Sequence, residues 1–155
     1  MLRAIISAFV ILVGSGFSVA AEPREGWVVL VSEKSFADLT KAVRAAVKTA
    51  PIAIVTHASA SDGARAQGHE IPGNRVFGLY RNDYARRMLA ASVEAGIEAP
   101  IRMYLTENAD GSATLSYKTP TAVFAPYFDE GGVDLQDLAA ELDQIFADVA
   151  TDAVN

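Results

Sequence analysis

PIRMYLTENADGSATLSYK, residues 100–118, is the stretch that decides the fold, because its pattern is that of a β-hairpin. From 101 to 106, apolar residues alternate with arginine, tyrosine and threonine, which is the period of a strand buried on one face. Asp110-Gly111 favours a tight turn, and the alternation resumes from 113 to 118. We therefore expect two antiparallel strands here, the clearest such pair in the chain.

Three further strands are expected before the hairpin. Short apolar runs rich in β-branched residues lie at 27–31, 52–56 and 75–80. Gly78 interrupts the third run, which indicates a bulge or a close approach of another segment. With the hairpin, these runs predict a sheet of about five strands.

Helices are expected between and after the strands. Ser35 caps the first, which Pro51 stops, and a short helix over 60–67 ends at Gly68. Residues 119–132 contain two prolines and a glycine pair and are expected to be mostly loop. Another helix is expected to begin with a cap at Asn82 or Asp83 and to end at Gly96. A last helix over 134–150 is expected to begin with a cap at Asp134.

The order of elements predicts an α+β fold. Strands and helices in this sequence make a two-layer sandwich, with one mixed sheet and helices mainly on one face. The first strand–helix–strand unit is expected to be right-handed.

The N-terminus has the pattern of a cleaved secretory signal peptide, residues 1–21. Arg3 precedes an apolar stretch, and Ser18-Val19-Ala20 forms a small-x-small cleavage site before Ala21, with Val19-Ala20-Ala21 as the next register. The stretch is shorter than the ~20 apolar residues that span a bilayer, so no stable membrane span is expected after cleavage. Residues 22–155 are then a single domain, periplasmic or secreted.

Cysteine is absent from the whole sequence. This excludes disulfides, thiol catalysis, thiolate metal sites and thioether attachment of haem. The chain carries a net charge of −6, and loss of Arg3 with the leader takes it to −7. An acidic exported chain is a poor candidate for binding nucleic acid, whose affinity depends on neutralised phosphates.

Charge is unevenly distributed along the chain. Eight acidic residues and no lysine or arginine lie between 129 and 155. Arginines crowd the middle, where they either bind a small anion or face the acidic terminal helix. They are Arg65, Arg75, Arg81, Arg86, Arg87 and Arg102.

Several short motifs in a fixed order resemble the bacterial domain of unknown function 302 family. A strand runs into His57-Ala58, a small-residue helix follows through Ala64, and Gly68-x-x-x-Pro72 comes next. The strand with Gly78 and the proline-entered hairpin continue the resemblance, which covers about 27–120. It implies a compact α+β domain, often dimeric, with no settled activity. The chain departs from the family's Gly-Asn-Pro turn, reading Gly-Leu-Tyr-Arg-Asn-Asp from Gly78, so only His57 is carried over.

His57 is the main candidate functional residue, because it lies where a strand ends and a helix begins. The alternatives are a ligand contact, a base, or a structural histidine. A metal site would pair His57 with His69, and imidazole with thioether ligands suits copper. Ordinary core methionines and a solvated histidine explain the same residues.

A second candidate site is a pocket for a carboxylate or phosphate near Arg81 and Tyr84, with Ser59 beside His57 as a further ligand contact. Recognised catalytic motifs are absent from the sequence. We therefore favour a non-catalytic protein that binds a small ligand or a protein partner beside His57. A metal- or haem-binding accessory protein is the alternative, and an enzyme comes third; the cofactor is unknown.

Overall fold

The computed structural model describes residues 24–155, so the expected signal peptide, residues 1–21, lies outside the described residues. Its strands are β1 (Trp27–Ser35), β2 (Ala53–Ala58), β3 (Asn74–Tyr80), β4 (Ile101–Glu107) and β5 (Ser112–Lys118). Its helices are α1 (Phe36–Thr49), α2 (Ala60–Ala66), α3 (Asn82–Ala91), α4 (Pro120–Phe124) and α5 (Phe128–Val154), with 3₁₀ segments η1 (Glu94–Glu98) and η2 (Ala125–Tyr127).

The five strands form one sheet in the order β1-β5-β4-β3-β2. The predicted hairpin is confirmed: β4 and β5 pair antiparallel, with Leu105 opposite Leu115. Gly111 in the connecting turn has φ of +84°, a conformation that glycine adopts without steric cost. The α+β class is therefore confirmed, with the hairpin at the sheet's interior.

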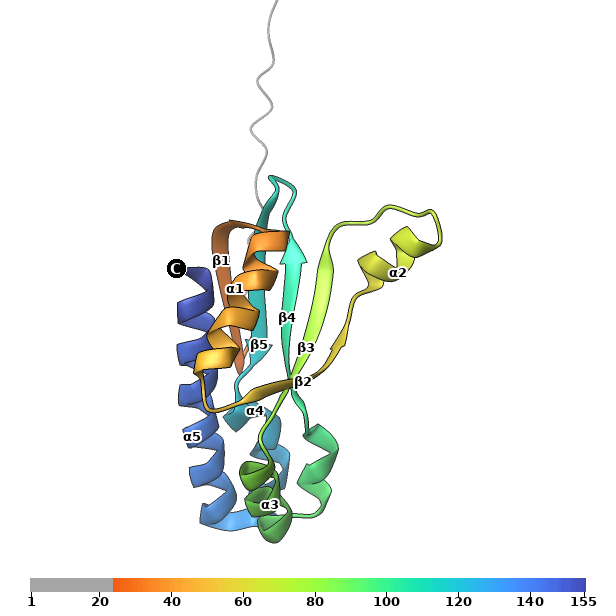
Figure 1. Ribbon diagram of the computed structural model, residues 1–155. Helices are drawn as coiled ribbons and strands as arrows, with labels where there is room; N and C mark the ends of the chain where they lie inside the picture. The colour runs from red at the N-terminus through yellow and green to blue at the C-terminus, as the bar shows by residue number, and fades with distance from the viewer. Residues whose placement is uncertain (1–23) are drawn as a thin grey trace, which may run out of the picture.

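The sheet is antiparallel throughout, and the expectation of a mixed sheet is corrected. β1 and β2 are not neighbours but occupy the two opposite edges, as Figure 1 shows. Helix α1 connects them across one face, and the three later strands fill the space between. The order of elements in the sequence does not determine how many strand positions separate the two strands that a crossover helix connects.

One face of the sheet packs against α1 and α5, and the core lies between them. Leu39 and Val43 of α1 are fully buried, as is Phe146 of α5, whose ring centroid lies 5.5 Å from that of Tyr117. Helix α1 begins as predicted, because the Ser35 hydroxyl accepts a hydrogen bond of 3.2 Å from the Asp38 backbone N–H. The apolar stripes of both helices thus meet the inward side chains of the strands.

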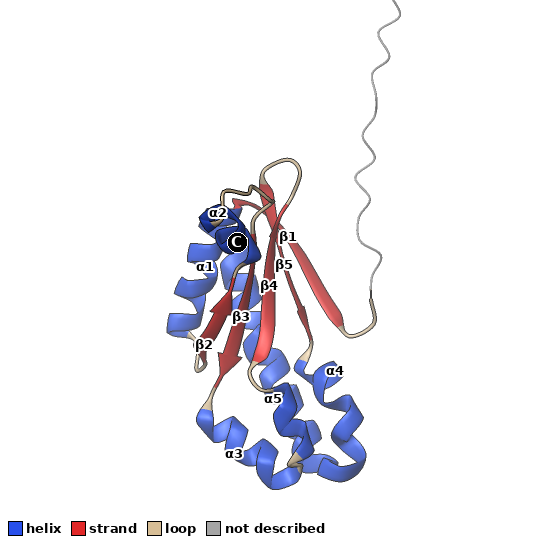
Figure 2. Ribbon diagram, turned by 90° about the vertical axis from the view of Figure 1, so that its right-hand side faces the viewer, coloured by secondary structure: helices blue, strands red, loops and turns tan. Residues whose placement is uncertain are grey.

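The lower end of the molecule consists of α3, α4 and the start of α5, below the ends of the strands in Figures 1 and 2. The prediction of a loop over 119–132 is wrong. Thr119 caps α4 by accepting a hydrogen bond of 3.2 Å from the Ala122 N–H, and Pro120 occupies the first turn, where a proline is tolerated. The last helix begins at Phe128, and Gly132, with φ of 56°, kinks it.

The limits of α3 also differ from those expected. Arg81, not Asn82 or Asp83, is the residue at its N-cap, and no side chain caps it. The helix ends at Ala91, before Gly96, and η1 continues the chain. Within residues 24–155, none of the helices combines the length and the apolar character that a bilayer crossing requires.

Candidate functional site

The face of the sheet opposite α1 and α5 carries the side chains that alternate with the core. Strand register arranges them in rows that run across the sheet. From β2 to β1, one row consists of Thr56, Gly78, Arg102, Lys118 and Trp27. The next contains Ala58, Val76, Tyr104, Ser116 and Val29. We call this surface the open face.

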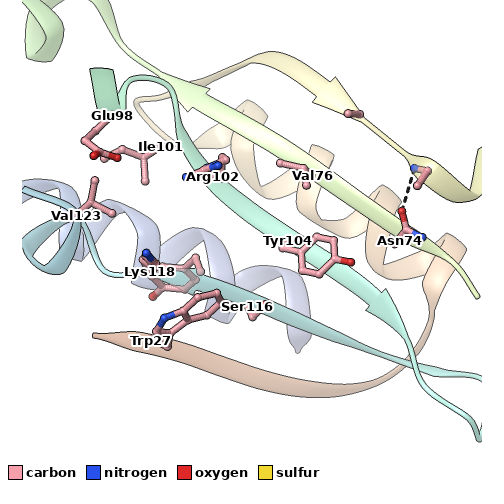
Figure 3. Close-up of a pocket in the computed structure, with 13 residues that line it drawn as sticks. Trp27, Asn74, Val76, Glu98, Ile101, Arg102, Tyr104, Ser116, Lys118 and Val123 are labelled. Atoms are coloured by element: carbon pink, nitrogen blue, oxygen red, sulfur yellow. Dashed lines mark hydrogen bonds between the residues drawn. The ribbon is translucent and has the colours of Figure 1, made fainter. Parts of the chain in front are cut away.

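A cavity of about 530 Å³ lies on the open face. Its walls come from all five strands and from the segments at the lower end, Glu98 of η1 and Val123 of α4. Figure 3 shows Trp27 and Lys118 at one side, Tyr104 and Val76 at the other, and Glu98 at one end. Its volume is in the range of pockets that hold small organic ligands.

Small residues make the hollow. Ala58, Ala60 and Ser116 line it, and Ser116 pairs directly with the bulky Tyr104. Side chains of adjacent strands project in parallel from a sheet, so a short side chain between long ones leaves a depression.

Gly78 draws Pro100 and Thr56 together beside the cavity, which confirms the predicted close approach. A Cβ atom at this position would lie 2.7 Å from Cγ of Pro100 and in contact with Oγ1 of Thr56. The strand register in β2 also shifts between Ile54 and Thr56. The residue therefore keeps β2 and the start of β4 close to β3.

Two cations lie side by side in the cavity. Met103 pairs with Tyr117, so Arg102 and Lys118 occupy the next position along β4 and β5. Neither forms a salt bridge with any residue in the described range 24–155. Like charges at opposed positions of neighbouring strands repel each other, so this pair is unfavourable without an anion.

Trp27 lies among cations as well. The Lys118 ammonium nitrogen is 5.8 Å from its ring centroid, and the Arg24 guanidinium carbon is 5.4 Å from it. Glu98 at the end of the cavity accepts a hydrogen bond of 3.1 Å from the Tyr127 hydroxyl. Burial, and after it this hydrogen bond, raises the pKa of Tyr127. The cavity thus combines aromatic and aliphatic walls with more positive than negative charge.

His57 lies next to the cavity but does not line it. It pairs with Phe77, which is fully buried on the helix-covered face, so the exposed His57 side chain belongs to that face at the edge of the sheet. His69 is exposed in the segment between α2 and β3. Within residues 24–155, no three His, Cys, Asp or Glu side chains are grouped to hold a metal ion.

Ser59 and Arg81 are occupied by contacts within the protein. Ser59 caps α2, its hydroxyl accepting a hydrogen bond of 3.1 Å from the Asp62 N–H. Arg81 donates two hydrogen bonds of 2.6 Å to Asp83 and one of 3.2 Å to the carbonyl of Pro51. Both side chains therefore stabilise local structure.

Tyr84 is held between two arginines. Its ring centroid is 4.7 Å from the Arg81 guanidinium carbon and 5.2 Å from that of Arg87. Arg87 pairs with Glu141 of the acidic helix α5, and the Arg87 hydrogen bonds lower the pKa of Glu141 to about 2. Of the two roles considered for the central arginines, Arg87 takes the pairing with the acidic helix.

The sequence profile of the family described as "Domain of unknown function DUF302" matches residues 28–150. The chain belongs to the DUF302 family. The match extends beyond the 27–120 expected and includes most of α5. A solved structure, the uncharacterized conserved protein DUF302 from Bacillus stearothermophilus, is similar in fold, with a TM-score of 0.72 and 12% sequence identity. The similarity covers 84% of this chain and 99% of that one. No curated protein sequence matches this chain.

In this DUF302 protein, sequence reasoning missed most of the cavity. The sequence pattern assigns Trp27, Tyr104 and Lys118 to strands and indicates no role for them, and it singles out Arg102 only as one of the central arginines. The alternation within 101–106 contained the information, because it assigns arginine and tyrosine to the side away from the core. Bringing them beside Trp27 required the pairing of β5 with both β4 and β1.

Proposed function

We propose that this DUF302 protein is an exported, non-catalytic binding protein that holds a small anionic ligand in the cavity of the open face. The observation that carries the proposal is the adjacency of Arg102 and Lys118, two cations without a carboxylate partner in the described chain. A bound anion turns this repulsion into two attractive contacts.

The overall charge strengthens this interpretation. The chain is acidic, with a net charge of −6, so a cavity with excess positive charge runs against its composition. The size of the cavity and its largely apolar walls suit a small organic molecule better than an inorganic ion.

Export to the periplasm or the medium is part of the proposal. It is supported by the leader pattern with Arg3 and the Ser18-Val19-Ala20 site, and by the absence of cysteine. N-terminal sequencing of the protein recovered from the periplasm or medium tests it, with a start near Ala21 or Glu22 expected. A mature chain that still begins at Met1 contradicts it.

A homodimer is also proposed. Leu89 of α3, Val93 between α3 and η1, and Ile97 of η1 are exposed by 46%, 71% and 81%. Exposed apolar residues grouped in this way commonly lie at interfaces. Sedimentation equilibrium tests this: a dimer that Ile97→Lys weakens supports the proposal, and a monomer at all concentrations rejects it.

Ligand binding is tested by isothermal titration calorimetry of the processed protein with two organic anions, octanoate and 2-naphthoate. We expect at least one of them to bind, and the double variant Arg102→Gln/Lys118→Gln to bind it at least tenfold more weakly. The matched control is Arg86→Gln/Lys48→Gln, which removes two exposed cations outside the cavity. Absence of binding by both anions, or equal loss in the control, rejects the proposal.

A further inference from the structure

Trp27 and Tyr104 form two walls on either side of Ser116. Strand β5, which carries Ser116, lies between β1 and β4 in the sheet. Strands are about 4.8 Å apart, so β1 and β4 are separated by roughly 9.6 Å. On β1, Val29 is the residue opposite Ser116, and Trp27 lies two residues further along, so Trp27 faces Tyr104 diagonally across β5. Ser116 pairs directly with Tyr104, and Figure 3 shows it between the two aromatic residues. The result is a slot with a low floor and two aromatic walls.

A slot with two aromatic walls suits a flat ring system. An aromatic ring also gains from offset or edge-to-face contact with Trp27 and Tyr104, which an aliphatic chain does not.

The charges of the cavity indicate a ligand with one negative charge. Arg102 and Lys118 contribute two positive charges, and Glu98 contributes one negative charge at the end of the cavity. Lys118 lies beside Trp27 at the mouth of the slot, so a ring between the walls brings its acidic group to the two cations. A second negative charge on the ligand would either be repelled by Glu98 or lie away from the two cations, so it would not strengthen binding.

We infer that the ligand is a flat aromatic monocarboxylate, with its ring between Trp27 and Tyr104 and its carboxylate at Arg102 and Lys118. This inference rests on the proposed function and specifies the ligand class of the same cavity. An inorganic anion makes no apolar contact with the two aromatic side chains, and a polyanion carries more negative charge than the two cations and Glu98 leave uncompensated.

The test compares four probes by calorimetry at one ionic strength: 2-naphthoate, octanoate, naphthalene-2,6-dicarboxylate and inorganic phosphate. We expect 2-naphthoate to bind about 3- to 10-fold more tightly than octanoate, the margin that aromatic contacts provide. The dicarboxylate and phosphate are expected to bind more weakly than 2-naphthoate.

Variants of Tyr104 separate ring recognition from charge recognition. Tyr104→Leu is expected to weaken 2-naphthoate about 3- to 10-fold and to leave octanoate unchanged, whereas Tyr104→Phe keeps the ring and binds like the wild type. Ser116→Leu fills the floor of the slot and should abolish binding of 2-naphthoate, with circular dichroism checking that the variant folds.

These experiments distinguish failure of the inferred ligand class from failure of the proposed function. Octanoate binding as tightly as 2-naphthoate, equal losses of both probes in Tyr104→Leu, or tighter binding of the dicarboxylate or phosphate overturns the aromatic monocarboxylate. The general anion site survives those results. If neither octanoate nor 2-naphthoate binds, the proposed function itself fails.

Discussion

Arg87 on α3 donates two hydrogen bonds of 2.8 Å to the carboxylate of Glu141 on α5 and so joins the two helices at the lower end of the molecule. Both side chains are about half exposed, so solvent screens the pair. It is nevertheless the clearest case in this chain where a central arginine meets the acidic helix.

The pair predicts a pH dependence of stability. The pKa of Glu141 falls from 4.5 to about 2 on folding, chiefly through its hydrogen bonds to Arg87. A lowered carboxyl pKa contributes stability above the unfolded value and loses it as the pH falls from about 4.5 to 2. In urea unfolding, Glu141→Gln should be less stable than the wild type at pH 7, with the difference vanishing near pH 2. An unchanged difference at both pH values contradicts this.

Phe146→Ala should be among the most destabilising single changes in the core. The side chain is fully buried and contacts the ring of Tyr117, so its removal leaves a cavity. We expect a loss of about 3–5 kcal/mol in the free energy of unfolding, measured in urea. Val31→Ala, at a side chain 73% exposed on the open face, is the control and should change stability by less than about 0.5 kcal/mol.

Gly78 and Gly63 should respond oppositely to alanine. A methyl group at Gly78 would collide with Thr56 and Pro100, so Gly78→Ala should cost about 1–3 kcal/mol. Gly63 lies within α2 with open space where its Cβ would be, so Gly63→Ala should gain about 0.4–1 kcal/mol. Thermal and urea unfolding of both variants measure this, and equal shifts would reject the close-approach role of Gly78.

Arg102→Gln should not destabilise the protein in the absence of ligand. The substitution relieves the repulsion between Arg102 and Lys118, so stability without ligand should stay the same or rise while anion affinity falls. Denaturation with and without 2-naphthoate provides both readouts. A clear loss of stability in the ligand-free protein would mean that Arg102 has a structural partner.

His57→Ala is expected to leave anion affinity unchanged. The side chain belongs to the helix-covered face, whereas its neighbour Ala58 lines the cavity. Calorimetry with 2-naphthoate checks this, and a tenfold loss of affinity would move the site to the edge of β2.

Local structure could be predicted from the sequence where local chemistry determines it. The hairpin at 100–118, the Ser35 cap and the end of α2 near Gly68 each depend on residues within a few positions of one another. The error at 119–132 has a local cause too, because prolines that favour loops also fit the first turn of a helix.

The sheet order and the site could not be predicted in the same way. Both depend on which strands lie beside each other, and residues of β1 pair with residues of β5 that lie 77 to 91 positions later in the chain. His57 attracted attention because histidine is chemically versatile. Arg102 and Lys118 are commonplace on a surface, and only the strand register makes them neighbours.

Trp27 is the sole tryptophan of the chain, and it forms a wall of the cavity instead of part of the core. Its indole emission therefore reports on the occupancy of the open face more directly than on global unfolding. Binding of unlabelled compounds can therefore be screened by the change in the wavelength and intensity of the Trp27 emission.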